Sequence, residues 1–150
     1  MTISRSTLLE FLRKHRYAVQ SSVHPDGGPQ SSVVGIAVSD TFEIVFDTLG
    51  ESRKAQNLRR HPRIALVIGG LEVGEEQSVQ FEGYADEPDG SERARLIELY
   101  LTVFPDGVER QSWSGLTYFK AIPEWLRYSD YSAAPPTIVE FDKAALDALR

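Results

Sequence analysis

The sequence contains 150 residues, of which 41% are hydrophobic and 25% are charged, and this suits one globular domain with its own core. We therefore expect residues 1–150 to form a single domain. The formal net charge of −6 disfavours a nucleic-acid partner, and no apolar run approaches the roughly 20 residues of a membrane-spanning helix. The sequence has no cysteine, which excludes disulfides and thiolate metal sites and suits a protein of the reducing cytoplasm.

The predicted elements of the first half are a helix over 4–15 and strands over 17–23, 30–39 and 42–47. The run His24-Pro25-Asp26-Gly27-Gly28-Pro29 is dense in turn-forming residues and predicts a hairpin between the first two strands. Phe42, Ile44 and Phe46 recur at every second position, which is typical of one face of a strand.

The second half predicts helices over 52–61 and 92–104, strands over 64–68, 77–86, 116–122 and 137–141, and a helical turn within 142–150. Residues 125–128 are expected to continue the 116–122 strand after an interruption at Pro123. The continuous apolar run 64–68 indicates a strand buried on both faces, and 105–114 is expected to be a loop. The first strands are joined by turns too short for a parallel crossover. The order therefore favours a mainly β fold, an antiparallel barrel of six or seven strands with flanking α-helices.

The start of the helix over 52–61 carries charges of the wrong sign for stability. Ser52 is a plausible N-cap, but Arg53 and Lys54 lie in the first turn, where each cation costs roughly 0.3–1 kcal/mol against the helix dipole. A bound anion, and phosphate above all, would turn this cost into a gain. The alternative is a solvated basic turn whose charge is partly offset by Glu51.

Around this helix the sequence resembles a known family. The segments Thr48-Leu49-Gly50-Glu51-Ser52-Arg53-Lys54-Ala55 and Asn57-Leu58-Arg59-Arg60-His61-Pro62-Arg63-Ile64-Ala65-Leu66 are similar to those of the pyridoxamine 5′-phosphate oxidase-like FMN-binding proteins. The resemblance implies a split β-barrel of Greek-key type and a homodimer with FMN in the groove between the subunits. It also implies that Ser52, Arg53 and Lys54 hold the FMN phosphate.

The same resemblance implies further cofactor contacts. They are Ser32, Val33 and Val34 after the first hairpin, Asp47 and Thr48 before the phosphate helix, Ser78 or Gln80 on the fifth strand, and Trp125 and Arg127 of the Pro123–Tyr128 segment. Without a cofactor, Ser78 and Gln80 would be ordinary outward-facing polar residues. Trp125 would then be a core residue and Arg127 a surface residue.

The sequence does not identify catalytic residues, and it predicts no metal site. His15, His24 and His61 form no metal-ligand motif, and there is no Gly-x-Ser-x-Gly elbow of a serine hydrolase. A C-terminal Arg-x-His-Asp-Arg-like segment, which holds substrate in the vitamin B6 oxidases, has no counterpart in this chain.

The expected function is therefore an FMN-dependent oxidoreductase acting on an unidentified small molecule, without a nucleic-acid or membrane partner. Two alternatives stay open. One is a reductase that uses the deazaflavin F420. The other is a non-catalytic binder of flavin or haem, for which the three histidines are the only axial ligands that the sequence offers.

Overall fold

The computed structural model describes residues 3–150, so the first two residues of the expected domain lie outside it. Eight strands form one antiparallel sheet: β1 (Tyr17–Val23), β2 (Pro29–Gly35), β3 (Ala37–Val38), β4 (Ile44–Leu49), β5 (Arg63–Gly69), β6 (Gln77–Asp86), β7 (Leu116–Asp130) and β8 (Thr137–Asp142). Five helices accompany it: α1 (Arg5–Arg13), α2 (Arg53–Arg60), α3 (Gly90–Val103), α4 (Gly107–Arg110) and α5 (Lys143–Ala148). No helix among residues 3–150 has the length and apolar character to cross a bilayer.

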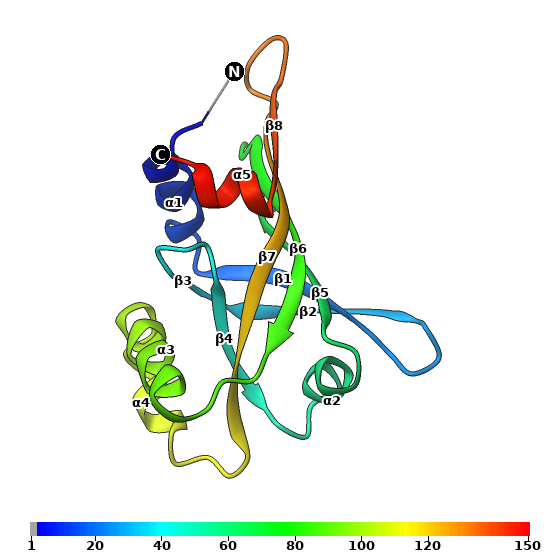
Figure 1. The fold of residues 1–150 in the computed structure, drawn as a ribbon, viewed down its shortest axis with the longest axis vertical. Helices are drawn as coiled ribbons and strands as arrows, with labels where there is room; N and C mark the ends of the chain where they lie inside the picture. The colour runs from blue at the N-terminus through cyan, green and yellow to red at the C-terminus, as the bar shows by residue number, and fades with distance from the viewer. Residues whose placement is uncertain (1–2) are drawn as a thin grey trace.

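The sheet has the order β2-β1-β5-β6-β7-β4-β3, and β8 pairs with the C-terminal half of β7, from Trp125 to Asp130. In Figure 1 the long strands β6 and β7 cross β1 and β2 steeply, and β2 comes near β4 as the sheet curls. The predicted mainly β, antiparallel split barrel with flanking helices is confirmed. It has more strands than predicted because the segment 30–39 is divided at Ile36, whose N–H donates to the carbonyl of Arg16 over 2.9 Å.

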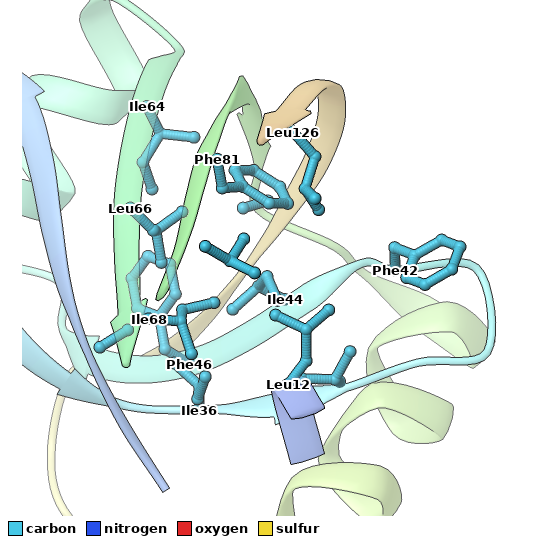
Figure 2. Packing of buried hydrophobic residues seen from close by; sticks show 14 of the residues in the cluster. Leu12, Ile36, Phe42, Ile44, Phe46, Ile64, Leu66, Ile68, Phe81 and Leu126 are labelled. Atoms are coloured by element: carbon cyan, nitrogen blue, oxygen red, sulfur yellow. The ribbon is translucent and has the colours of Figure 1, made fainter. Parts of the chain in front are cut away.

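The main hydrophobic core fills the concave side of the curled sheet. Leu66 and Phe81 of neighbouring strands meet Ile44 and Phe46 of β4, and Leu12 of α1 closes one end (Figure 2). All five side chains are almost fully buried. Because strand side chains alternate between faces, this packing fixes which residues of each strand point away from the core.

A second, smaller core lies on the other side of β4 and β7, beneath α3. It is formed by Ala37, Val45, Leu96, Tyr100, Phe104 and Tyr118. The alternation along β4 explains the arrangement, since Val45 points to α3 while its neighbours Ile44 and Phe46 point into the main core. The first half of β4 is therefore packed on both of its faces.

Three details of the predicted elements are wrong. Phe42 is buried, but it lies in the turn before β4 with a φ of +63°, so the apparent alternation begins outside the strand. The run 64–68 is not buried on both faces, because Val67 keeps 38% of its surface exposed. The predicted loop 105–114 contains the short helix α4, which packs beside α3.

Candidate functional site

The turn that leads into α2 is fixed by backbone hydrogen bonds. The N–H of Gly50 donates to the carbonyl of Gly115 over 2.7 Å, and the N–H of Ser52 donates to the carbonyl of Leu49 over 2.9 Å. The Ser52 hydroxyl then accepts from the N–H of Ala55 over 3.2 Å, so the predicted N-cap is confirmed.

Arg59 braces the same turn from the last part of α2. Its guanidinium makes a two-pronged ion pair with Glu87, at 2.8 Å and 2.6 Å, and its third nitrogen donates to the carbonyl of Gly50 over 2.8 Å. The Thr117 hydroxyl also donates to Glu87. Guanidinium and carboxylate match each other geometrically in such a pair, so the turn is held rigidly.

Hydroxyl groups and cations converge at the start of α2. The Lys54 ammonium donates to the Thr48 hydroxyl over 3.1 Å, and the Thr48 and Ser52 hydroxyls lie 3.0 Å apart. Burial lowers the pKa of Lys54, and the negative charge of Asp47 opposes this shift. Arg53 is exposed, and within residues 3–150 neither cation forms an ion pair with a carboxylate. We call Thr48, Ser52, Arg53 and Lys54 the basic cradle.

The Asp47 side chain is directed away from the basic cradle. Its carboxylate accepts from the Tyr100 hydroxyl of α3 over 3.0 Å and from Nε of Arg110 in α4 over 2.8 Å. Arg110 also reaches Asp106 at 3.1 Å. Burial is the main reason that the pKa of Tyr100 is raised well above its usual value. The predicted cofactor contact of Asp47 could therefore use only its backbone.

A layer of buried polar side chains lies between α2 and the β1–β2 hairpin. Asn57 of α2 donates to the Ser22 hydroxyl over 3.1 Å and to Oε1 of Gln30 over 2.8 Å. Gln20 donates to the Ser32 hydroxyl over 2.7 Å, while its buried Oε1 has no hydrogen-bond partner in the part of the chain that the structure describes. Of the three residues predicted on β2, only Ser32 joins this layer.

The other two predicted residues on β2 point elsewhere. Val34 belongs to the main core, and Val33 is 66% exposed on the opposite face of the strand. Because β2 is the edge strand of the sheet, its outer backbone groups are free of a neighbouring strand. Val33 and Val34 could thus contact a cofactor through the backbone.

The remaining predicted residues lie together on the convex face of β6 and β7. Gln80 of β6 is paired in register with Arg127 of β7 and with Val67 of β5. Trp125 lies two positions before Arg127 in β7, so both side chains are on the same face. Ser78 and Gln80 line a shallow groove of about 360 Å³ that also includes Val19 and Val67. We call Ser78, Gln80, Trp125 and Arg127 the convex-face group.

Arg127 is incompletely satisfied in this position. Its Nε is buried and has no hydrogen-bond partner within the described residues 3–150, and its Nη1 lies 3.6 Å from the Glu140 carboxylate. A buried charged group without a full set of partners is costly. A ligand or another protein surface with acceptor oxygens would remove this cost.

The basic cradle and the convex-face group are not brought together within one chain. Thr48 is paired with Thr117, and Trp125 lies eight residues further along β7, which corresponds to roughly 26 Å at 3.3 Å per residue. The two groups also face opposite sides of the sheet, because Thr48 follows the core residue Phe46 in alternation while Trp125 precedes the core residue Leu126.

The histidines show no arrangement for metal binding. Both ring nitrogens of His15 are engaged, one with the Phe11 carbonyl at 2.9 Å and the other with the Glu75 carboxylate, while His24 pairs with Asp26 at 3.0 Å. Among residues 3–150, no cluster of three or more His, Cys, Asp or Glu could hold a metal ion. Trp113, in the loop after α4, is 55% exposed.

Sequence reasoning missed four residues that shape the site. Tyr100 and Arg110 hold Asp47 from a distance of 53 and 63 residues, and no local pattern marks such a pair. Gln20 shares its buried face of β1 with Ala18 and Ser22, and Asn57 lies beside Ala55 and Leu58 among the buried residues of α2. Because the buried face of β1 mixes small, polar and apolar residues, the local sequence gives no signal that marks Gln20.

Comparison with known proteins gives this architecture a family context. The family model for pyridoxamine 5′-phosphate oxidase matches residues 5–129. The chain is 32% identical over 94 residues to the pyridoxine/pyridoxamine 5′-phosphate oxidase of Burkholderia lata, and the alignment covers 63% of this chain and 41% of that protein. The chain therefore spans less than half of this curated relative.

Solved structures share the fold at low sequence identity. A haem-binding protein from Mycobacterium smegmatis superposes with a TM-score of 0.82 at 16% identity, over 99% of this chain and 62% of that one. An FMN-binding, pyridoxamine 5′-phosphate oxidase-related protein from Nostoc punctiforme gives a TM-score of 0.68 at 15% identity, over 91% and 87%. With the family model matching most of the sequence, the chain belongs to the pyridoxamine 5′-phosphate oxidase family.

Proposed function

We propose that this protein binds FMN and acts, as a homodimer, as a flavin-dependent oxidoreductase on a small molecule. The observation that carries the proposal is the basic cradle. Two cations without carboxylate partners among residues 3–150 lie at the electropositive end of α2, beside two hydroxyls that can donate hydrogen bonds. In the absence of an anion this arrangement costs stability, and a phosphate removes the cost.

The donor set of the cradle fits a phosphate group. Arg53 and Lys54 supply charge, Thr48 and Ser52 supply hydroxyls, and the first N–H groups of α2 supply backbone donors. Ser32 and the edge of β2 are the predicted residues that we propose for the rest of the cofactor, since Asn57 of α2 is hydrogen-bonded to Gln30 of β2. The FMN-binding neighbour from Nostoc punctiforme supports the choice of this phosphorylated ring.

We infer that the convex-face group contributes to the cofactor site of a second copy of the chain. Because it lies roughly 26 Å from the cradle along β7 and faces the other side of the sheet, it cannot contact the same cofactor within one protomer. In the homodimer that we propose, Arg127 and Trp125 of each protomer extend the cradle of the other. The exposed Val67 and Val33 on this convex face would be covered by the contact.

Bound flavin supplies the redox chemistry, the transfer of hydride or single electrons, and the protein supplies binding, orientation and electrostatics. The curated relative from Burkholderia lata is a pyridoxine/pyridoxamine 5′-phosphate oxidase, but this chain spans only 41% of it. We therefore propose a small-molecule substrate without assigning its class.

The visible absorption spectrum of freshly purified protein tests the proposal, followed by mass spectrometry of the extracted cofactor. We expect flavin bands, the mass of FMN, and a rise in the thermal midpoint when FMN is added to stripped protein. The Lys54→Gln variant should show a much smaller rise. If the extracted cofactor had the mass of F420, or if the spectrum showed a haem Soret band, the bound cofactor would be F420 or haem instead of FMN. The proposal would be overturned if the purified protein were colourless and added FMN left its thermal midpoint unchanged.

A further inference from the structure

Asp47 introduces a negative charge directly beside the basic cradle. It precedes Thr48 in β4, and its carboxylate is largely buried, with 15% of the side chain exposed. Its charge acts on Lys54, because it partly opposes the effect of burial on the pKa of that lysine. An uncompensated carboxylate here would repel the same phosphate that the cradle attracts.

Arg110 is placed to cancel this charge. Its Nε lies 2.8 Å from Oδ2 of Asp47, and Tyr100 donates to Oδ1 over 3.0 Å, so both oxygens are occupied. Arg110 is itself mostly buried, with 20% of its side chain exposed, and its other partner is Asp106 on the solvent side. Water therefore screens this pair poorly, and the net charge of Asp47 and Arg110 affects the electrostatic potential at the neighbouring basic cradle.

We propose that Arg110 is a positioning residue for the phosphate site: it neutralises Asp47 and turns that carboxylate toward α3 and α4, so that the cradle presents net positive charge to an anionic ligand. This inference rests on the proposed function, since it concerns the same cradle. It assigns a role to the segment that contains α3 and α4. Arg110 acts through Asp47 and does not itself contact the ligand.

A charge cycle at these two positions separates electrostatic from purely structural effects. The variants are Arg110→Gln, Asp47→Asn and the double variant, all close in shape to the original side chains. The ligands are FMN and riboflavin, which differ by the phosphate group alone. Dissociation constants follow from flavin fluorescence titration of stripped protein, at low and at moderate salt.

For Arg110→Gln we expect FMN to bind about tenfold more weakly while the riboflavin affinity stays within about twofold of the original. Asp47→Asn should bind FMN at least as tightly as the original chain. The double variant should return to within about threefold of the original affinity, because neither charge remains. The loss in Arg110→Gln should shrink as salt increases.

A structural brace would give a different pattern. FMN and riboflavin would then weaken together, and Asp47→Asn would weaken FMN binding instead of preserving it. Either result, or an FMN affinity for Arg110→Gln equal to the original, would overturn the inference. If Arg110→Gln does not fold, Asp47→Asn alone still decides between tighter and weaker FMN binding. Failure of the original chain to bind FMN would instead contradict the proposed function, so the two failures are distinguishable.

Discussion

Lys54 shows how a single side chain can be unfavourable for the free protein and favourable for its complex. Burial lowers the pKa of its ammonium group, so the folded chain binds this proton less tightly than the unfolded chain does. The contribution of Lys54 to stability therefore rises as pH rises through the lowered pKa. A bound phosphate would reverse this preference by stabilising the charged form.

Two consequences of replacing Lys54 with glutamine can be measured. We expect free Lys54→Gln protein to melt at the same or a slightly higher temperature than the original chain. Its FMN affinity should fall roughly tenfold or more, because a charge-assisted hydrogen bond contributes about 1.5–3 kcal/mol. FMN binding to the original chain should weaken at alkaline pH as Lys54 loses its proton, and this dependence should be absent in the variant.

Calorimetric scans and fluorescence titrations over a range of pH check both expectations. Lys14→Gln is the matched control, since Lys14 is an exposed lysine at the end of α1, far along the chain from the cradle. It should change neither the melting temperature nor the FMN affinity appreciably. A Lys54→Gln variant with undiminished FMN affinity would show that this lysine does not face the phosphate.

Among the elements, α2 was the most predictable because its signals are local. A serine cap, a short apolar face and a following proline all lie within about ten residues of each other, and each has its own physical cause. The contact of Asp47 with α3 and α4 could not be predicted, because it joins residues more than 50 positions apart. Val67 was misread because an apolar run does not reveal whether another protein surface covers one of its faces.

The pairing of β6 with β7 contains a β-bulge, and the backbone there leaves no room for a side chain at Gly83. The register shifts between Glu82 and Gly83, because Glu82 pairs with Trp125 and Gly83 with Pro123, which makes Glu124 the extra residue of β7. A Cβ added at Gly83 would lie 1.9 Å from the carbonyl oxygen of Ile122, which is backbone and cannot rotate away. Only glycine therefore fits this position.

Gly83→Ala should accordingly destabilise the protein by at least about 2 kcal/mol, since overpacking of a fixed backbone typically costs 1–3 kcal/mol or more. Urea denaturation followed by circular dichroism measures the loss. The control is Gly28→Ala in the β1–β2 turn, where an added Cβ meets only the flexible Asp26 side chain. Equal stability of the two variants would mean that β7 can shift at the bulge without cost.

At the scale of the whole molecule, the sheet itself separates the residues that the family resemblance assigned to one site. Thr48 and Lys54 lie at one end of β4, and Trp125 and Arg127 lie on the opposite face of the distant half of β7. The sequence predicted each group from a local motif, but it could not show that one chain keeps them apart. The register and the alternating side-chain directions of β7 show that the two groups are apart within one chain.

This separation makes the shared site in the dimer testable by mixing variants. Lys54→Gln damages the cradle and Arg127→Gln damages the convex-face group, so each homodimer should contain two damaged sites. A heterodimer of the two variants would instead carry one site with both defects and one site with neither. Protomers exchanged under mild denaturant and then refolded together should regain tight FMN binding at about a quarter of all sites, because half of the dimers are mixed.

Titration of the mixture with FMN would resolve this tight fraction from the weak sites, with each variant refolded alone as the control. A site built within one protomer gives the opposite outcome, because mixing would then leave every site with its single defect and restore nothing. The roughly 26 Å along β7 between Thr117 and Trp125 favours restoration. Restoration would also support an acceptor across the interface for Arg127, whose Nε has no hydrogen-bond partner among residues 3–150.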